Sequence, residues 1–297
     1  RPDGDCTGSV LALYNYIVEN MPETDVDLYL EQPGSEFYYL KNIDKIKNTP
    51  EDKKYDVFFV LDCSSLDRIE PFISCFNNAS KIVCIDHHVS NTGFTDLSKI
   101  EPQASSACEV LYGTMDADKI SRNVAECIYT GIIHDTGVFK YSCTSKKTME
   151  IAGEMMEKGI DYSDIIDNTF YKKTYVQNQI LGRALLESVL FYDGKCIFTT
   201  VTIDEMEFYG VTGRELGGIV EQLRLTDGVE VAIFLYQTGE EEYKVSLRSK
   251  KKIDVAAIAT QFGGGGHVRA AGYTAKGSVY QIINSIGELI EKQYNAM

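Results

Sequence analysis

Short apolar stretches alternate with helical patterns through the first third of the chain. Residues 26–30, 55–62 and 81–86 are rich in β-branched or aromatic residues, which is typical of buried strands. Residues 9–20 and 68–79 have the length and the apolar spacing expected of helices. Because strands that alternate with helices form parallel sheets with crossover helices, we predict an α/β fold for this region.

The pattern changes twice further along the chain. Residues 105–190 are almost entirely helical in pattern, with Ser or Thr at several predicted N-caps. Strand-like stretches return at 195–202, 229–237 and 242–249, together with helical patterns at 213–225 and 278–293. We therefore predict a parallel-sheet α/β domain at 1–173, a linker helix at 174–190 and a smaller α+β domain at 191–297.

The composition is that of an acidic globular protein. The chain has 29 Lys and Arg against 44 Asp and Glu, a net charge of −15, which argues against a long nucleic-acid duplex as partner. A small phosphorylated substrate held by metal ions stays compatible with that charge. The eight cysteines form no C-x-x-C pair, which argues against a zinc ribbon and indicates reduced residues in a cytoplasmic protein. No apolar stretch has the length of a membrane helix, so we predict no membrane partner.

Acidic residues and histidines follow several of the apolar stretches. Asp62 ends one predicted strand, and the triplet 86–88 (Asp-His-His) ends the next. Asp3 and Asp5 lie in a turn before a predicted helix, and Asp135 closes another apolar run. Ligands of a parallel α/β sheet bind at the carboxyl ends of its strands, so we expect these side chains to meet at the strand ends of one sheet.

Such a gathering of carboxylates predicts a metal centre. Several anions in one place repel one another, and two divalent ions would neutralise them. Carboxylate and imidazole without thiolate favour Mn²⁺ or Mg²⁺ over structural zinc, and Asp62 and Asp135 are plausible bridging ligands. Taken singly, each residue has a structural alternative: Asp3 or Asp5 as a helix cap, Asp62 as a turn residue, and a histidine as part of the core.

With these motifs in order, the sequence resembles the DHH phosphoesterase family. The resemblance is carried by "PDGDCTGS" (2–9), "VLDCSS" (60–65), "DHH" followed by "VSN" (86–91), "GIIHDTGVFKY" (131–141) and "FGGGGHVRAAG" (262–272). The length and the pairing of "SLRS" with the glycine run are similar to the oligoribonuclease (nanoRNase) group of that family. The resemblance implies manganese-dependent hydrolysis of short oligoribonucleotides, of the 3′-phosphate of pAp, or of pApA, and near relatives cleave cyclic di-AMP.

The resemblance also implies roles for the metal-site residues. Asp3 and Asp5 would each bind one of two manganese ions, for which Mg²⁺ or Co²⁺ could substitute. Asp62 would bridge both ions, His87 would complete one ligand shell, and Asp135 would be a further ligand. These five residues form the expected ligand set.

Two further histidines belong to the expected catalytic site: His88 and the first histidine of the family motif. His88 would touch the substrate phosphate, so that the expected catalytic residues are Asp62, His88 and Asp135, with Asp86 orienting a neighbouring histidine. The family motif usually reads His-x-x-Pro-Asp-Gly-Asp, and its first histidine would fall two residues before Arg1. We expect that histidine, and a strand before it, to lie upstream of the given sequence.

The C-terminal glycine run predicts a second part of the site. It follows the helical stretch 255–261, and we expect another helix to begin after it. Bare backbone N–H groups there could hold a phosphate or a terminal ribose, although a flexible turn is the plain alternative. Together with the resemblance, this gives the expected substrate contacts His88, Arg248, Ser249, Gly264, Gly265, Gly266, His267 and Arg269.

The function expected from these features is hydrolysis of short RNA or small nucleotides by a metal-activated water. Family rivals are an inorganic pyrophosphatase, whose second domain has a basic signature in place of the glycine run, and a longer RecJ-like exonuclease. A non-catalytic nucleotide-binding protein with a degenerate metal site is the alternative from another class. A homodimer is possible through the apolar helices at 105–190, which could equally be core.

Overall fold

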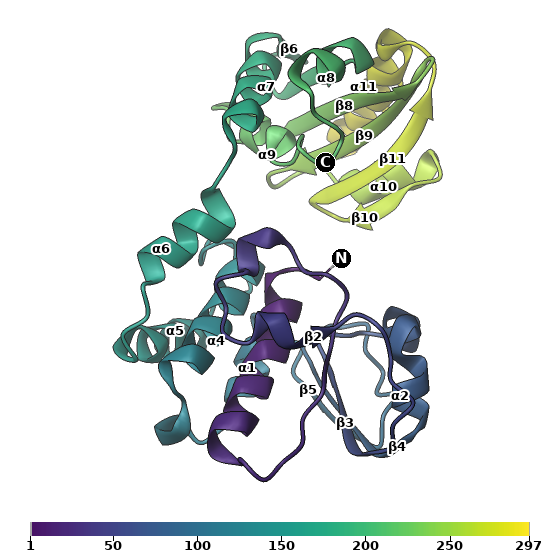
Figure 1. Ribbon diagram of the computed structural model, residues 1–297. Coiled ribbons are helices and arrows are strands. Elements are labelled where there is room, and N and C mark those ends of the chain that lie inside the picture. The colour runs from purple at the N-terminus through teal and green to yellow at the C-terminus, as the bar shows by residue number, and fades with distance from the viewer. Residues whose placement is uncertain (1, 297) are drawn as a thin grey trace. The chain divides into compact units, whose positions relative to one another are not determined.

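The computed structural model describes residues 2–296 and divides the chain into two compact units, Arg1–Lys172 and Lys173–Met297 (Figure 1). The first unit contains a parallel sheet and the second a mixed sheet, which confirms the predicted α/β class. The helix expected as a linker, α7 (Tyr175–Leu186), packs into the core of the second unit through Ile180 and Ala184.

Three parallel strands in the order β3-β4-β5 form the main sheet of the first unit. Their bounds are β3 Tyr55–Leu61, β4 Ala79–Asp86 and β5 Leu97–Ile100. The predicted strand at 26–30 is much shorter, because only β1 (Leu28–Tyr29) pairs, and it pairs with β2 (Ile46–Lys47) in a separate two-stranded sheet. The carboxyl ends of β3 and β4 lead directly into Asp62 and the Asp-His-His triplet.

Helices pack against this sheet and against one another. Their bounds are α1 Gly4–Asn20, α2 Ile73–Asn77, α3 Ala107–Tyr112, α4 Arg122–Asp135, α5 Lys146–Glu157 and α6 Tyr162–Ile166. The helices α1 and α4 lie side by side in Figure 1, and their apolar faces share one core that includes Leu11, Ile128 and Ile132. The helix predicted at 68–79 is divided between a 3₁₀ stretch, Leu66–Phe72, in which Pro71 lacks a backbone donor, and the short α-helix α2.

A six-stranded sheet in the order β10-β11-β9-β8-β7-β6 organises the second unit. Its strands are β6 Val189–Phe191, β7 Cys196–Val201, β8 Val231–Gly239, β9 Glu242–Ser249, β10 Gly265–His267 and β11 Ala270–Lys276. Among the described pairings of this six-stranded sheet, only β7-β8 is parallel.

Helices cover both faces of the second sheet. One face packs against α7 and α9 (Ile219–Arg224), and the other against α10 (Val255–Gln261) and α11 (Val279–Asn295), while α8 spans Ile203–Tyr209. The expectation of a helix after the glycine run is wrong, since the run enters β10, which forms a hairpin with β11. No helix within residues 2–296 combines the length and apolar character needed to cross a membrane.

Candidate metal centre

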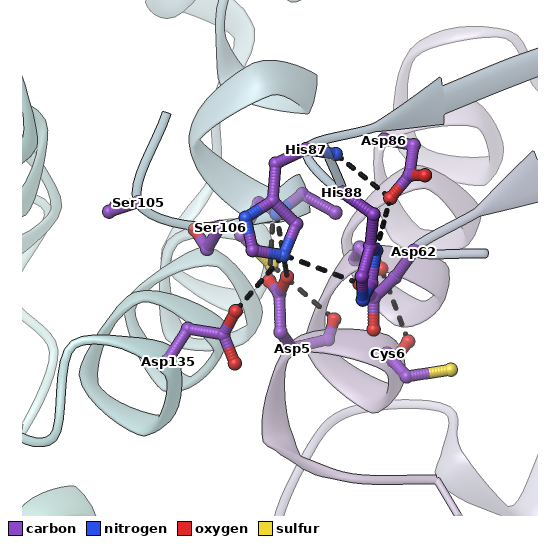
Figure 2. A network of polar contacts seen from close by, with 12 residues as sticks. Asp5, Cys6, Asp62, Asp86, His87, His88, Ser105, Ser106 and Asp135 are labelled. Carbon is purple, nitrogen blue, oxygen red and sulfur yellow. Dashed lines mark hydrogen bonds and ion pairs between the residues drawn. The ribbon is translucent and has the colours of Figure 1, made fainter. Parts of the chain in front are cut away.

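Three carboxylates converge on one imidazole nitrogen in the first unit. The Nε2 atom of His87 lies 3.1 Å from Asp135 Oδ2, 3.7 Å from Asp62 Oδ1 and 3.8 Å from Asp5 Oδ2. Figure 2 shows the three carboxylates pointing toward the ring from different segments. The structure therefore brings together four of the five predicted metal ligands.

The four residues come from helices as well as strands. His87 follows β4, and Asp62 follows β3 in a left-handed conformation with φ of 53°, which Asp tolerates better than most residues. Asp5 lies in the first turn of α1, and Asp135 is the last residue of α4. The expectation that all these residues lie at strand ends is thus wrong for Asp135, because helix α4 brings it to the edge of the sheet.

Asp5 is fully buried and held by backbone donors. Its carboxylate accepts hydrogen bonds from the N–H groups of Ala107 (2.6 Å) and Cys108 (3.0 Å) in the first turn of α3. Burial and the nearby charge of Asp135 nevertheless raise the pKa of Asp5 to about 7, against the lowering effect of His87 and the two N–H groups. The carboxylate is fixed in place but short of positive charge.

Uncompensated negative charge also raises the pKa of Asp62 and of His87. Burial, followed by the charges of Asp5 and Asp3, raises the pKa of Asp62 to about 10. Burial alone would lower the pKa of His87, but the hydrogen bond to Asp135 and the charge of Asp5 raise it to about 9. Within residues 2–296, the ion pairs of Asp5, Asp62 and Asp135 go to imidazoles. A cation placed among these groups would relieve the repulsion.

The donor set suits a divalent ion. Ligand atoms of Asp5, His87 and Asp135 lie within 4.8 Å of one another, and so do those of Asp62, His87 and His88. Carboxylate oxygen and imidazole nitrogen are ligands for hard or borderline ions. The residues present therefore fit a metal site centred on His87.

Asp3 has a different position from the other predicted ligands. It is the exposed N-cap of α1, and its Oδ1 accepts a hydrogen bond from Cys6 N at 3.0 Å. The structure does not place Asp3 in either group of candidate ligands, although its charge contributes to the raised pKa of Asp62. The helix cap that the sequence left open as an alternative is the contact that the structure shows.

His134 packs behind the turn that carries Asp3 and Asp5. A Cβ atom added to Gly4 would lie 2.2 Å from His134 Cγ, so only glycine lets the start of α1 approach this ring. The ring also packs edge-on against Phe37 and Phe170, and its Nε2 lies 3.0 Å from Thr169 Oγ1. The sequence showed that His134 neighbours Asp135 but gave no sign of this packing role.

His88 is oriented by a buried pair behind it. Asp86 is fully buried, and its Oδ1 lies 2.7 Å from His88 Nδ1. The side chain of Asn91 donates to Asp86 Oδ2 at 2.6 Å and to the carbonyl oxygen of Cys63 at 3.1 Å. Burial opposes ionisation of Asp86, but the hydrogen bonds from His88 and Asn91 hold its pKa below the usual value. Asn91 had no predicted role, and only its place three residues after the triplet could have suggested one.

The predicted substrate contacts of the second unit are separated by the sheet. Arg248 in β9 pairs with Ala270 in β11, which pairs with His267 in β10, so these three side chains share one face. Ser249 faces the other way, is buried, and donates its hydroxyl proton to Ile253 O at 2.7 Å. Arg269 is exposed, and its Nη1 donates to the same carbonyl at 2.8 Å.

The glycine run is a tight backbone passage. The N–H groups of Gly263 and Gly264 donate to carbonyls of α10, and the next three residues pair with β11. Gly266 has φ of 145°, and a Cβ there would lie 2.4 Å from Ala270 O. A Cβ at Gly265 would meet nothing within 4 Å. The predicted phosphate nest thus has its first two N–H groups in use, while Gly265 and His267 lie on the open face.

Two family models match this chain. Residues 1–132 match the N-terminal domain of the DHH family, and residues 193–293 match the DHHA1 domain. The first match contains Asp5, Asp62 and His87, and the second contains Arg248 and the glycine run.

Relatives of known name match most of the chain. The bifunctional oligoribonuclease and PAP phosphatase NrnA of Bacillus subtilis (strain 168) is 27% identical over 277 residues, covering 92% of this chain and 86% of the relative. The protein of the same name from Thermus thermophilus is 27% identical over 295 residues, covering 93% and 82%. A solved structure described as an exopolyphosphatase-related protein from Bacteroides fragilis is 26% identical, covers 98% of this chain and 89% of its own, and has a TM-score of 0.84.

Proposed function

Because this chain belongs to the DHH family, with a DHH domain followed by a DHHA1 domain, we propose that it hydrolyses phosphate esters of short oligoribonucleotides and of pAp-type nucleotides. The names of the Bacillus and Thermus relatives, which match it over more than nine tenths of its length, support this substrate class. The reaction would release a nucleoside monophosphate from an oligonucleotide, or inorganic phosphate from pAp.

The observation that carries the proposal is the convergence of Asp5, Asp62 and Asp135 on His87 Nε2. Asp5 and Asp62 have raised pKa values in the protein alone, and a divalent cation would restore their ionised forms. We propose manganese as that cation, with two ions in the active protein. Asp5, His87 and Asp135 would hold one ion, Asp62 would reach both, and Asp3 would turn from its capping position toward the second.

Divalent ions held there would supply Lewis-acid chemistry, which activates water and offsets charge on the phosphate. The residues of the chain would do the positioning. Asp86, held by Asn91, fixes the ring of His88 through Nδ1, and Nε2 would be the atom that contacts substrate. His88 would then contact a phosphate oxygen, and its hydrogen bond to Asp86 raises the pKa of its imidazole, which favours the protonated, donating form.

The second unit would bind the nucleotide. Arg248 and His267 lie on one face of its sheet beside the small residues Gly265 and Gly272. We propose that this face takes the nucleotide, with Arg269 and the backbone of Gly264 and Gly266 at its margin. Ser249 faces the opposite side and would act indirectly: its hydroxyl donates to Ile253 O, which would hold the end of β9, and thus Arg248, in place.

The test is a substrate panel with Mn²⁺: di- to pentaribonucleotides, pAp, pApA, cyclic di-AMP and pyrophosphate. We expect AMP from the short oligonucleotides and phosphate from pAp, and we expect Asp62→Ala to lose these activities together, by about 10³-fold. Asp56→Ala is the matched control, because Asp56 is an exposed aspartate of β3, the strand that Asp62 follows.

The outcomes separate the alternatives. Turnover of pyrophosphate alone would favour an inorganic pyrophosphatase. Binding of pApA without turnover would favour a nucleotide-binding protein with a degenerate metal site. Either result contradicts the proposal, as does retention of one activity in Asp62→Ala.

A further inference from the structure

Two arginines meet at one carboxylate in the second unit. Glu221 in α9 accepts a hydrogen bond from Arg248 Nε at 2.5 Å through Oε1, and one from Arg224 Nε at 3.0 Å through Oε2. Burial opposes ionisation of Glu221, but the two guanidinium groups hold its pKa below the usual value. The cluster therefore keeps two positive charges around one negative charge.

Both arginines keep most of their donors. Each uses Nε for Glu221, and Arg248 gives one further hydrogen bond, from Nη1 to its own neighbour Leu247 O at 3.0 Å. Within residues 2–296, the outer nitrogens of Arg224 have no other hydrogen bond. The side chains are partly exposed, 19% for Arg224 and 27% for Arg248, so these donors can reach a ligand.

The arginine pair lies at the sheet face already proposed to bind nucleotide. Arg248 pairs with Ala232 of β8 on one side and with Ala270 of β11 on the other, and Ala270 pairs with His267. Ala232 belongs to the core under α7 and α9. Arg248 pairs with Ala232 and therefore lies at the edge of the part of the sheet that α9 covers. Beyond it, the small residues of β11 and β10 leave that face open.

We propose that Arg224 and Arg248 together bind the terminal phosphate of the nucleotide, the one that is not cleaved, and that Glu221 positions both guanidinium groups for it. Planar guanidinium groups bind phosphate oxygens through paired N–H donors, and the cluster keeps a net positive charge after Glu221 offsets one arginine, which favours a phosphate anion. This rests on the proposed function, because pAp and 5′-phosphorylated oligoribonucleotides carry a second phosphate besides the one that reacts.

A purely structural role for the cluster makes a different prediction. Glu221 also ties α9 to β9, so loss of Arg224 could lower stability without touching substrate. A structural role would affect all substrates alike, whereas a phosphate-binding role depends on whether the substrate carries the terminal phosphate.

The experiment compares substrates that differ only in that phosphate: pApA with ApA, and pAp with 3′-AMP. For Arg224→Gln we expect KM to rise on the order of 10-fold for pApA and pAp, with little change for ApA and 3′-AMP and with kcat retained. Arg224→Lys keeps the charge and should recover part of the affinity. Arg183→Gln is the matched control, since it removes an arginine paired with Glu187 and Glu205 in the same unit.

Binding separates this inference from the proposed hydrolysis. A chelator stops metal-dependent turnover, so that calorimetry can measure binding alone. We expect wild type to bind pApA more tightly than ApA, and we expect Arg224→Gln to abolish this difference. If wild type lacks hydrolysis but keeps this difference, the proposed function fails and the phosphate site stands. Equal losses for both members of each substrate pair, with both Arg224 variants folded by their melting temperatures, would overturn the phosphate site.

Discussion

The two units handle buried charge in opposite ways. In the first, Asp5, Asp62 and Asp135 gather around His87, and burial raises the pKa of Asp5 and Asp62. In the second, Glu221 is balanced by two arginines, and its pKa is lowered. As proposed here, an external cation would complete the first arrangement, whereas the second already holds counter-charges of its own and would accept an anion.

The two clusters therefore depend on a ligand to different degrees. A charge cluster without its own counter-charge costs stability until the ligand arrives, so ligand and stability are coupled in the first unit. A balanced cluster contributes to the fold with or without its ligand.

Removing divalent metal should affect the first unit most. We expect chelation to lower hydrolysis by about 10³-fold or more and to make stability strongly pH-dependent. The pKa is raised to about 7 for Asp5, about 10 for Asp62 and about 9 for His87 in the metal-free protein. A group with a raised pKa stabilises the folded state while protonated, and this stabilisation is lost as pH rises through the folded value.

The free energy of unfolding of the chelated protein should therefore fall from about pH 4, where unfolded aspartates lose their protons, to about pH 10, where folded Asp62 does. Chemical denaturation at several pH values measures it, and Mn²⁺ should stabilise more at pH 8.5 than at pH 6. Asp62→Asn should flatten the fall. An equally steep fall in that variant would contradict the assignment to this cluster.

Loss of the Asn91 side chain should misplace His88. In Asn91→Ala, Asp86 Oδ2 and the Cys63 carbonyl lose their donor, so we expect kcat to fall by about 10- to 100-fold. The free energy of unfolding should drop by about 1–3 kcal/mol, because buried acceptors are left unpaired. Steady-state kinetics checks the first effect, and unchanged kcat would show that His88 needs no such support.

A methyl group at Gly4 should push the metal-binding turn away from His134. We expect Gly4→Ala to cost about 1–3 kcal/mol and to weaken Mn²⁺ binding, since the added Cβ would overlap the ring. His134→Ala in the same chain removes the obstacle and should restore part of both losses. Thermal unfolding and metal titration of the single and double variants measure this, and additive losses would argue against the contact.

The smallest effects should come from the glycine run. Gly266→Ala should destabilise by about 1–2 kcal/mol, because φ of 145° is strained for alanine and its Cβ meets the Ala270 carbonyl. Gly265→Ala should change stability by less than about 0.5 kcal/mol, since its Cβ meets open space. Denaturant melts of the pair provide the comparison, and equal losses would place the constraint elsewhere.

Local pattern determined much of this protein. The alternation of strands and helices predicted the parallel sheet and the smaller second domain, because burial sets the period of apolar residues. The sequence also predicted that the polar residues after β3 and β4 belong to a site, since ligands bind at the carboxyl ends of parallel strands.

Only the tertiary structure decided which of these residues meet. The packing of α1 and α4 carries Asp5 and Asp135 to His87, while Asp3, two residues from Asp5, turns away to cap its helix. Strand register places Arg248 beside Ala270 and His267, and the place of α9 adds Arg224 through Glu221. These outcomes depend on contacts between segments far apart in the chain, and the spacing of residues within one segment carries no record of them.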